Sequence, residues 1–213
     1  MAKASSTGII DYGVGNLRSV FNAVKAVGGE PVLTGSAKEL LACDRLILPG
    51  VGAFAHGMAE LKSRGLDTLI KDAAQNGKPV MGICLGMQML AQDSLEFGET
   101  KGLGLADGVV SMIAPPNPDQ LLRLPHVGWK QLTQTSDQAA WLFAGIEPEA
   151  RFYFIHSFAL SSNSAHVVAT ADHDGVAFCA VLSVGNVVGT QFHPERSGPQ
   201  GLMMLKNFVM KGL

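Results

Sequence analysis

Short apolar runs and segments of helical periodicity alternate along the first half of the chain. The runs predict strands at residues 8–11, 31–33, 45–48 and 80–83. Apolar positions at helical spacing predict helices over 17–27, 36–41 and 56–76, the last broken near Gly65. Asn16 and Ser36 stand where a side chain can cap the first two helices. This alternation is typical of parallel strands joined by crossover helices.

Strands predominate in the second half, with few helices between them. They are predicted at residues 109–112, 129–132, 151–155, 166–170, 176–182 and 187–191. Val184-Gly185-Asn186 is a good hairpin turn, so antiparallel pairing fits this half better. A helix from Gly198 is expected to cover the sheet with its apolar face, and residues 113–120, with three prolines, form a predicted surface loop. We therefore expect one α/β domain over residues 1–213, with a mostly parallel central sheet flanked by helices and an antiparallel portion in the second half.

Composition and charge narrow the classes of function. The 213 residues include 16 Lys and Arg against 18 Asp and Glu, and only 7% are aromatic, which disfavours nucleic acid as the primary ligand. The most apolar stretch, residues 80–91, is interrupted by Gly82, Gly86 and Gln88 and is shorter than the roughly 20 residues of a membrane-spanning helix. The first residues lack the apolar core of a signal peptide. We expect a cytoplasmic protein with no membrane segment.

The motifs indicate neither a metal nor a nucleotide cofactor. Cys43, Cys84 and Cys179 are too few and too far apart for a disulfide framework or a Cys-x-x-Cys metal site. None of the six histidines lies four residues from another, the spacing that places two metal ligands on one helix face. No P-loop occurs, and Gly13-Val14-Gly15 lacks the third glycine of a dinucleotide fingerprint. We expect no cofactor and no catalytic metal.

Cys84 stands where a predicted strand meets a helical pattern, in the sequence Gly82-Ile83-Cys84-Leu85-Gly86. This G-x-C-x-G pattern is typical of a nucleophile elbow, with sulfur in place of a serine hydroxyl. A nucleophile on such a tight turn is strained, and side chains at the two glycine positions would collide with the backbone. N–H groups at the start of the next helix favour a thiolate. The alternative is a buried core cysteine at a glycine-rich strand end.

His193 and Glu195 supply a candidate base and its orienting group at the end of the last predicted strand, in Gly189-Thr190-Gln191-Phe192-His193-Pro194-Glu195. Pro194 favours an extended His193, so both side chains are expected to point the same way, about 6 to 7 Å apart at their roots. The carboxylate can then reach Nδ1 while Nε2 faces the sulfur, as in a catalytic triad. A surface or capping histidine is the alternative.

The segment Pro49-Gly50-Val51-Gly52-Ala53-Phe54 follows the third predicted strand. Glycines on both sides of Val51 allow the neighbouring N–H groups to turn towards a developing oxyanion, and Gly52 lets a substrate lie close to the backbone. A plain turn between a strand and a helix would look similar. Loops at the carboxyl ends of parallel strands are, however, where such sheets bind ligands.

These three motifs, in this order and spacing, resemble those of the triad-type (class I) glutamine amidotransferases over essentially the whole chain. Further segments, residues 10–20, 125–129, 153–157 and 193–197, are similar to the branch of that family that serves histidine biosynthesis. The resemblance implies a glutaminase. Cys84 would attack the side-chain amide of glutamine and form a glutamyl thioester, with His193 as acid and base and Glu195 as its orienter.

Other residue roles follow from the resemblance. The N–H groups that hold the oxyanion would come from Val51, Gly52 and Leu85. The substrate would be bound by Gly52, Gln88, Glu96, Ser157 and Phe158, with Glu96 recognising its α-amino group. The partner would be contacted by Asn16, Trp129, Tyr153 and Arg196. Taken without the family, Glu96 fits a solvated acidic turn and Trp129 an ordinary core aromatic.

The implied partner is a (βα)8-barrel cyclase subunit in a heterodimer. It would take ammonia through an internal passage and make imidazole glycerol phosphate and an aminoimidazole carboxamide ribotide. The resemblance also implies that residues 50–52 rest in an inactive peptide orientation until the cyclase binds its substrate, so the isolated chain should be very slow. The alternatives are the glutaminase of another synthase, such as pyridoxal phosphate synthase, a non-catalytic interaction subunit of this fold, and a cysteine hydrolase or peptidase of similar topology.

Overall fold

The computed structural model describes residues 5–115 and 121–211 and contains one large mixed sheet. Its parallel half is formed by β1 (Ser6–Ile10), β2 (Glu30–Thr34), β3 (Arg45–Gly50) and β4 (Val80–Cys84). Its other half is formed by β9 (Thr133–Gln134), β12 (Val167–His173), β13 (Val176–Val184) and β14 (Val187–Thr190). The strand order is β2-β1-β3-β4-β14-β13-β12-β9, and β14 pairs parallel to β4 but antiparallel to β13. The predicted fold class is confirmed.

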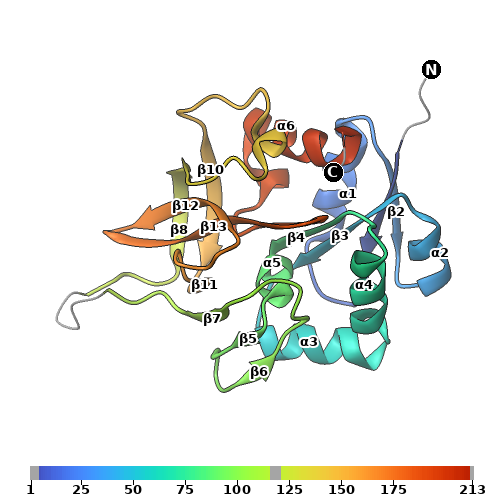
Figure 1. Ribbon diagram of the computed structural model, residues 1–213, viewed down its shortest axis with the longest axis horizontal. Coiled ribbons are helices and arrows are strands. Elements are labelled where there is room, and N and C mark those ends of the chain that lie inside the picture. Colours follow the sequence, from blue (N-terminus) through green and yellow to red (C-terminus); the bar gives the residue numbers. More distant parts are fainter. Residues whose placement is uncertain (1–4, 116–120, 212–213) are drawn as a thin grey trace.

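Helices cover both faces of this sheet (Figure 1). One face carries α1 (Leu17–Ala26) and α6 (Gly198–Lys206), and the other carries α2 (Ala37–Ala42), α3 (Phe54–Ser63), α4 (Leu66–Gln75) and α5 (Leu85–Leu90). Successive strand residues point to opposite faces, so Ile9 packs in the same cluster as Val24 while Ile10 packs in the cluster of Leu40. The burial of apolar side chains away from water in both clusters is the main force that holds the helices on the sheet.

Two smaller sheets extend the second half. One pairs β8 (His126–Gln131) with β10 (Arg151–His156), and the other contains β11 (Phe158–Leu160), β7 (Val109–Met112), β5 (Asp93–Ser94) and β6 (Thr100–Lys101). Three short non-α helices complete the fold: η1 (Ala140–Phe143), η2 (Pro194–Arg196) and η3 (Asn207–Lys211). The strands β5, β6, β9 and β11 were not predicted, because two or three residues are too few to show a period.

Several local predictions can be compared with the structure. Gly65 separates α3 from α4 with a positive φ of 66°, as its position in the pattern suggested. Val184 pairs with Val187 across the predicted hairpin turn. The capping prediction was wrong in detail, because Asn16 and Ser36 occupy N-cap positions but neither side chain makes a capping hydrogen bond. The Oδ1 of Asn16 accepts instead from the hydroxyl of Ser19 over 3.0 Å. The predicted loop at 113–120 lies partly outside the described residues.

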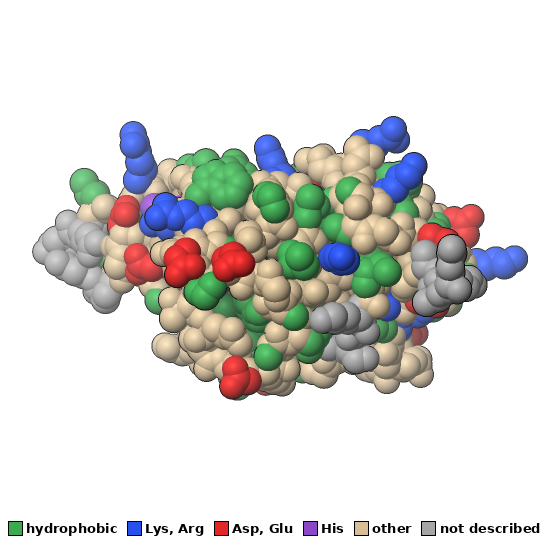
Figure 2. All heavy atoms as spheres, turned by 90° about the horizontal axis from the view of Figure 1, so that it is seen from above, with side chains coloured by type: hydrophobic (Ala, Val, Ile, Leu, Met, Phe, Trp, Pro, Cys, Tyr) green, Lys and Arg blue, Asp and Glu red, His purple; other side chains and the backbone are tan. Residues whose placement is uncertain are grey.

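The surface carries charges of both signs. On the face shown in Figure 2, hydrophobic side chains lie among backbone and polar atoms, and Lys, Arg, Asp and Glu side chains are scattered between them and along the margins. No extended field of one sign occurs on this face. Within the described ranges, none of the helices has the length and apolar character needed to cross a membrane.

Candidate active site

The elbow around Cys84 is tightly packed. Cys84 joins β4 to α5 with φ 54° and ψ −111°, a strained conformation for a residue with a side chain. A Cβ atom at Gly82 would lie 2.7 Å from the backbone of Met87, and one at Gly86 would lie 1.8 Å from the carbonyl oxygen of Leu48. Both glycines are therefore required for β3, β4 and α5 to pack this closely, and the thiol is held in a single place.

The sheet order brings His193 to the elbow. Because β14 lies beside β4, with Gly189 opposite Gly82, the chain leaving β14 reaches the same edge of the sheet as Cys84. His193 is extended before its proline, with φ −99° and ψ 95°. Its backbone N–H donates to the carbonyl of Tyr153, 3.0 Å away. Glu195 follows on the turn η2, not on the strand itself, and still reaches the imidazole.

The imidazole and carboxylate form a buried pair. Nδ1 of His193 lies 2.9 Å from Oε1 of Glu195, and the Glu195 side chain has no exposed surface. Burial by itself lowers the pKa of His193, but the interactions with Cys84 and Glu195 outweigh it and raise the pKa to about 10. Nε2 makes no hydrogen bond of normal geometry to the described residues. Since Nδ1 is taken by Glu195, Nε2 is the atom left to face the sulfur.

Cys84 and His193 open into one cavity of about 260 Å³. Every residue expected to hold the oxyanion or the substrate also lines it: Val51, Gly52, Leu85, Gln88, Glu96, Ser157 and Phe158. Ile155, His156 and Arg196 complete the wall. The size suits a small polar metabolite, and its residues come from five separate stretches of the sequence that only the fold brings together.

The glycine loop lies at the rim of this cavity. Gly50 ends β3 directly opposite Cys84, and the next two residues leave the sheet. Val51 is 40% exposed, and Gly52 has a φ of +95° with open space where a side chain would be. At the far end of the loop, the N–H of Phe54 donates to Oε2 of Glu96 over 2.7 Å. The Glu96 carboxylate, which is expected to bind the substrate, thus also holds the first residue of α3.

Comparison with known proteins identifies the family. The family model described as glutamine amidotransferase class-I matches residues 8–211, nearly the whole chain. The chain belongs to the class-I glutamine amidotransferase family. This agrees with the elbow cysteine and the buried histidine–glutamate pair that meet at the cavity.

Relatives in this amidotransferase family are similar over nearly their full length. Imidazole glycerol phosphate synthase subunit HisH 1 of Legionella pneumophila (strain Lens) is 43% identical over 210 residues, covering 96% of this chain and 99% of that protein. Subunit HisH of Methanosarcina barkeri (strain Fusaro / DSM 804) is 45% identical over 203 residues, covering 94% and 96%. The structure of PurLQS from Thermotoga maritima aligns with a TM-score of 0.72 and 23% identity over 98% of this chain and 99% of that one, which shows a shared fold.

Gln191 is a residue of the amidotransferase site to which sequence reasoning gave no role. Its Nε2 lies 3.8 Å from the Cys84 sulfur, and its Oε1 accepts a hydrogen bond of 3.0 Å from Gln88. Gln88 also donates to the carbonyl of Phe158, 2.7 Å away. The two glutamines therefore link the nucleophile to the opposite wall of the cavity. The signal was present, because Gln191 belongs to the motif that contains His193, but only contacts could give it a role.

The expected partner-contact residues fall into two places. Trp129 and Tyr153 are opposite each other on β8 and β10, with ring centroids 5.8 Å apart. The Arg196 guanidinium lies over the Tyr153 ring at 5.1 Å. These three form a continuous group beside the cavity, to which Arg196 also contributes. Asn16 lies apart from them, at a small void of about 10 Å³ behind the His193–Glu195 pair.

Neutral histidines support the wall opposite the elbow. His156 lines the cavity and lies within hydrogen-bonding distance of His126, 3.2 Å away, and of the Phe158 carbonyl, 3.0 Å away. His126 stacks on His173 at a centroid distance of 4.3 Å. Burial lowers the pKa of His126 to about 4 and of His156 to about 3. The rings of His126 and His156 are therefore uncharged packing groups at neutral pH.

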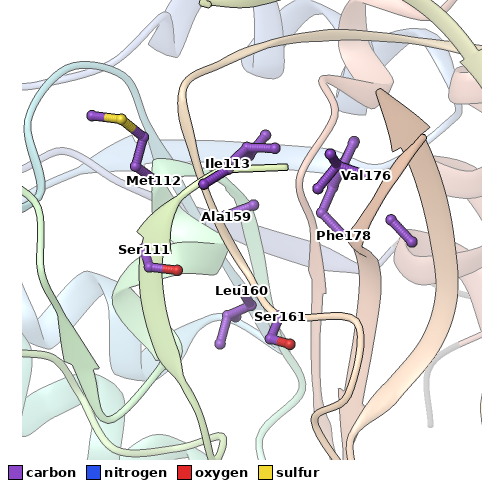
Figure 3. A pocket seen from close by; sticks show the side chains of 10 residues that line it. Ser111, Met112, Ile113, Ala159, Leu160, Ser161, Val176 and Phe178 are labelled. Atoms are coloured by element: carbon purple, nitrogen blue, oxygen red, sulfur yellow. The ribbon is translucent and has the colours of Figure 1, made fainter. Parts of the chain in front are cut away.

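A second hollow of about 150 Å³ lies between β7, β11 and β13 (Figure 3). Its lining consists of small and apolar side chains together with the hydroxyls of Ser111 and Ser161. No acid, base or thiol faces it, so it offers no group for the chemistry of an amidotransferase. Two of the catalytic candidates, Cys84 and His193, line the cavity at the elbow, and Glu195 is bonded to His193 from behind it.

Proposed function

We propose that this chain is the glutaminase subunit of an imidazole glycerol phosphate synthase, which hydrolyses L-glutamine to glutamate and ammonia and passes the ammonia to a cyclase subunit. The observation that carries the proposal is the meeting of a strained elbow cysteine with the buried His193–Glu195 pair in a cavity of metabolite size. The relatives described above bear the name of that synthase subunit and match over nearly their full length.

The chemistry follows the position of each group. The Cys84 sulfur attacks the side-chain amide carbon of glutamine with the proton already held on His193, and backbone N–H groups of the glycine loop and Leu85 hold the oxyanion. His193 then returns the proton to the amide nitrogen, so that ammonia leaves and a glutamyl thioester remains. Water, deprotonated by His193, attacks the thioester and releases glutamate and the free thiol. Glu195 holds the ring in the required tautomer and stabilises the imidazolium.

An apolar surface next to the cavity is the proposed docking face for the cyclase. On β8 and β10, Val127 is 54% exposed, Trp129 47% and Ile155 39%. Ile155 lies between two buried residues of β10, and Val127 and Trp129 alternate with less exposed residues of β8. Exposed apolar side chains gathered in one place mark interaction sites. Ile155 also lines the cavity, so a subunit seated here would cover the site where ammonia is formed. Covering matters because ammonia released to neutral water would be protonated and lose its nucleophilicity.

We also place this reaction in the cytoplasm. The three cysteines are all buried and unpaired, which fits a reducing compartment. The alternative is that this chain serves another synthase, as the glutaminase of pyridoxal phosphate synthase. Reconstitution with a candidate cyclase distinguishes the two functions.

Reconstitution with the cyclase tests the proposal. The Cys84→Ala variant is expected to lose glutamine-dependent synthase activity by a factor on the order of 10⁴ or more, because no other group forms the thioester. Activity with ammonium salt should be unchanged, since the cyclase needs only ammonia. The measurements are glutamate release and synthase turnover, each with glutamine and with ammonium.

The matched control is Cys43→Ala, which removes a buried thiol from the other side of the fold and should leave glutamate release unchanged. Glutamate release that persists in the Cys84 variant contradicts the proposal. So does wild-type glutamine hydrolysis that runs at the full rate without the cyclase.

A further inference from the structure

The Tyr12 side chain reaches the base of the glycine loop at residues 49–54, which is the proposed oxyanion loop. Tyr12 is completely buried, and its hydroxyl donates to the carbonyl of Pro49 over 2.9 Å. The ladder between β1 and β3 ends at the pair Ile9 and Ile47, before Pro49. The tyrosine side chain therefore supplies a donor where the neighbouring strand no longer does. Without it, the buried carbonyl would lose this partner.

The loop that carries Tyr12 is shaped to deliver this contact. Asp11 accepts a hydrogen bond from the N–H of Gly13 over 3.0 Å, which closes a turn around the tyrosine. Gly15 lies beside Gly50, so that an added Cβ would be in ordinary contact with the Gly50 Cα at 3.8 Å. The segment between β1 and α1 thus packs directly on the oxyanion loop.

We propose that Tyr12 is a positioning residue for glutamine hydrolysis, which holds the peptide between Pro49 and Gly50 so that the next peptide can present its N–H to the oxyanion. The inference rests on the proposed glutaminase function. A Cβ at Gly50 would lie 2.7 Å from the Tyr12 hydroxyl and 2.9 Å from the N atom of Gly86, so Gly50 is confined between Tyr12 and the elbow. Any rotation is thereby confined to the peptides that follow it.

The hydroxyl is suited to this role because it stays protonated. Burial raises the pKa of Tyr12 well above its usual value, and the nearby Cys84 raises it further. The other end of the loop is held by Glu96 through the N–H of Phe54. Between these two anchors, Val51 and Gly52 are exposed, and no atom lies within 4 Å of the place where a Gly52 side chain would be. The loop is held at both ends, with its middle residues at the surface.

The test compares Tyr12→Phe with wild type in complex with the cyclase. We expect kcat for glutamate release to fall at least fivefold while KM stays within twofold, because the anchor acts on the transition state and not on substrate binding. The rate of Cys84 alkylation by iodoacetamide should stay within twofold, since the thiol and its imidazole are untouched. Placing p-aminophenylalanine at position 12 restores a donor and should restore kcat.

Asn207→Ala is the stability control, because it removes another buried side-chain donor to two backbone carbonyls, at η3. Its kcat should equal that of wild type even if its unfolding midpoint falls as far as that of Tyr12→Phe. An unchanged kcat in Tyr12→Phe, a rise in KM alone, or an equal loss of alkylation overturns the inference. If Tyr12→Phe does not fold, the p-aminophenylalanine variant is the test. Normal unfolding with a fivefold lower kcat in that variant overturns the inference, and a normal kcat supports it. Failure of the wild-type complex to release glutamate would instead refute the proposed function.

Discussion

The two backbone segments that meet at Cys84 differ in how firmly they are packed. Around the elbow, β4 and α5 are buried at every residue, and the glycines touch backbone atoms of neighbouring elements. The oxyanion loop has its middle residues, Val51 and Gly52, at the surface with open space beside Gly52. The expected nucleophile is therefore fixed by the chain's own core, whereas the proposed oxyanion donors lie at the surface, where a partner could reach them.

The largest expected effect comes from Gly86→Ala, at the packed elbow. The added Cβ would lie 1.8 Å from the Leu48 carbonyl oxygen, so β3 and α5 must separate. We expect the free energy of unfolding to fall by about 3 kcal/mol or more, at the upper end of overpacking effects. Urea unfolding followed by circular dichroism measures it.

Gly77→Ala is the matched control for that change. Gly77 has a φ of +81° and open space around it, so alanine there costs only conformational strain, about 1 to 2 kcal/mol. Equal losses at the two positions would show that the elbow is not packed as the structure has it.

In contrast to Gly86→Ala, Gly52→Ala should lower the rate of glutamate release more than the free energy of unfolding. Alanine at a φ of +95° in open space costs about 1 to 2 kcal/mol of stability. Because it restricts a peptide that is expected to donate to the oxyanion, kcat for glutamate release in the complex should fall by about 10². A variant that keeps its kcat, or that unfolds as easily as Gly86→Ala, would remove the contrast between the loop and the elbow.

The smallest expected effect is the loss of stability in acid that comes from the buried histidines His126 and His156. His126 and His156 have folded pKa values near 4 and 3, below the unfolded value of 6.5, so the stability they contribute is present above pH 6.5 and lost as pH falls towards 3. His193, with its pKa raised to about 10, acts in the opposite sense: its contribution is full below pH 6.5 and lost as pH rises through 10. The net expectation is a loss of about 2 kcal/mol between pH 7.5 and 5.

Urea unfolding at the two pH values measures this loss. The variant His126→Gln removes one of the two destabilising protonations and should make the pH dependence shallower. Stability that rises steadily from pH 7.5 to 5 would mean that these rings are not buried as neutral groups.

The parallel half of the fold and the main site motifs were readable from sequence, because each depends on local rules. The glycines around Cys84 and the Pro194 next to His193 are required by backbone conformations that only those residues adopt easily. The short strands of the second half and the contact of Gln191 with the sulfur were not readable. They depend on which distant segments pair, and a two-residue strand has no period of its own.

By itself, the sequence determined the residue types and turns that this chemistry needs: a sulfur on a glycine-flanked elbow, a histidine before a proline, and a glycine loop after a strand. Only the tertiary structure decided that these parts meet. The pairing of β14 with β4 carries His193 to Cys84, and the end of the β1 ladder leaves a carbonyl for Tyr12. The physical reason is that local preferences act over a few residues, whereas the cavity is made by contacts between strands that the core brings together from far apart in the chain.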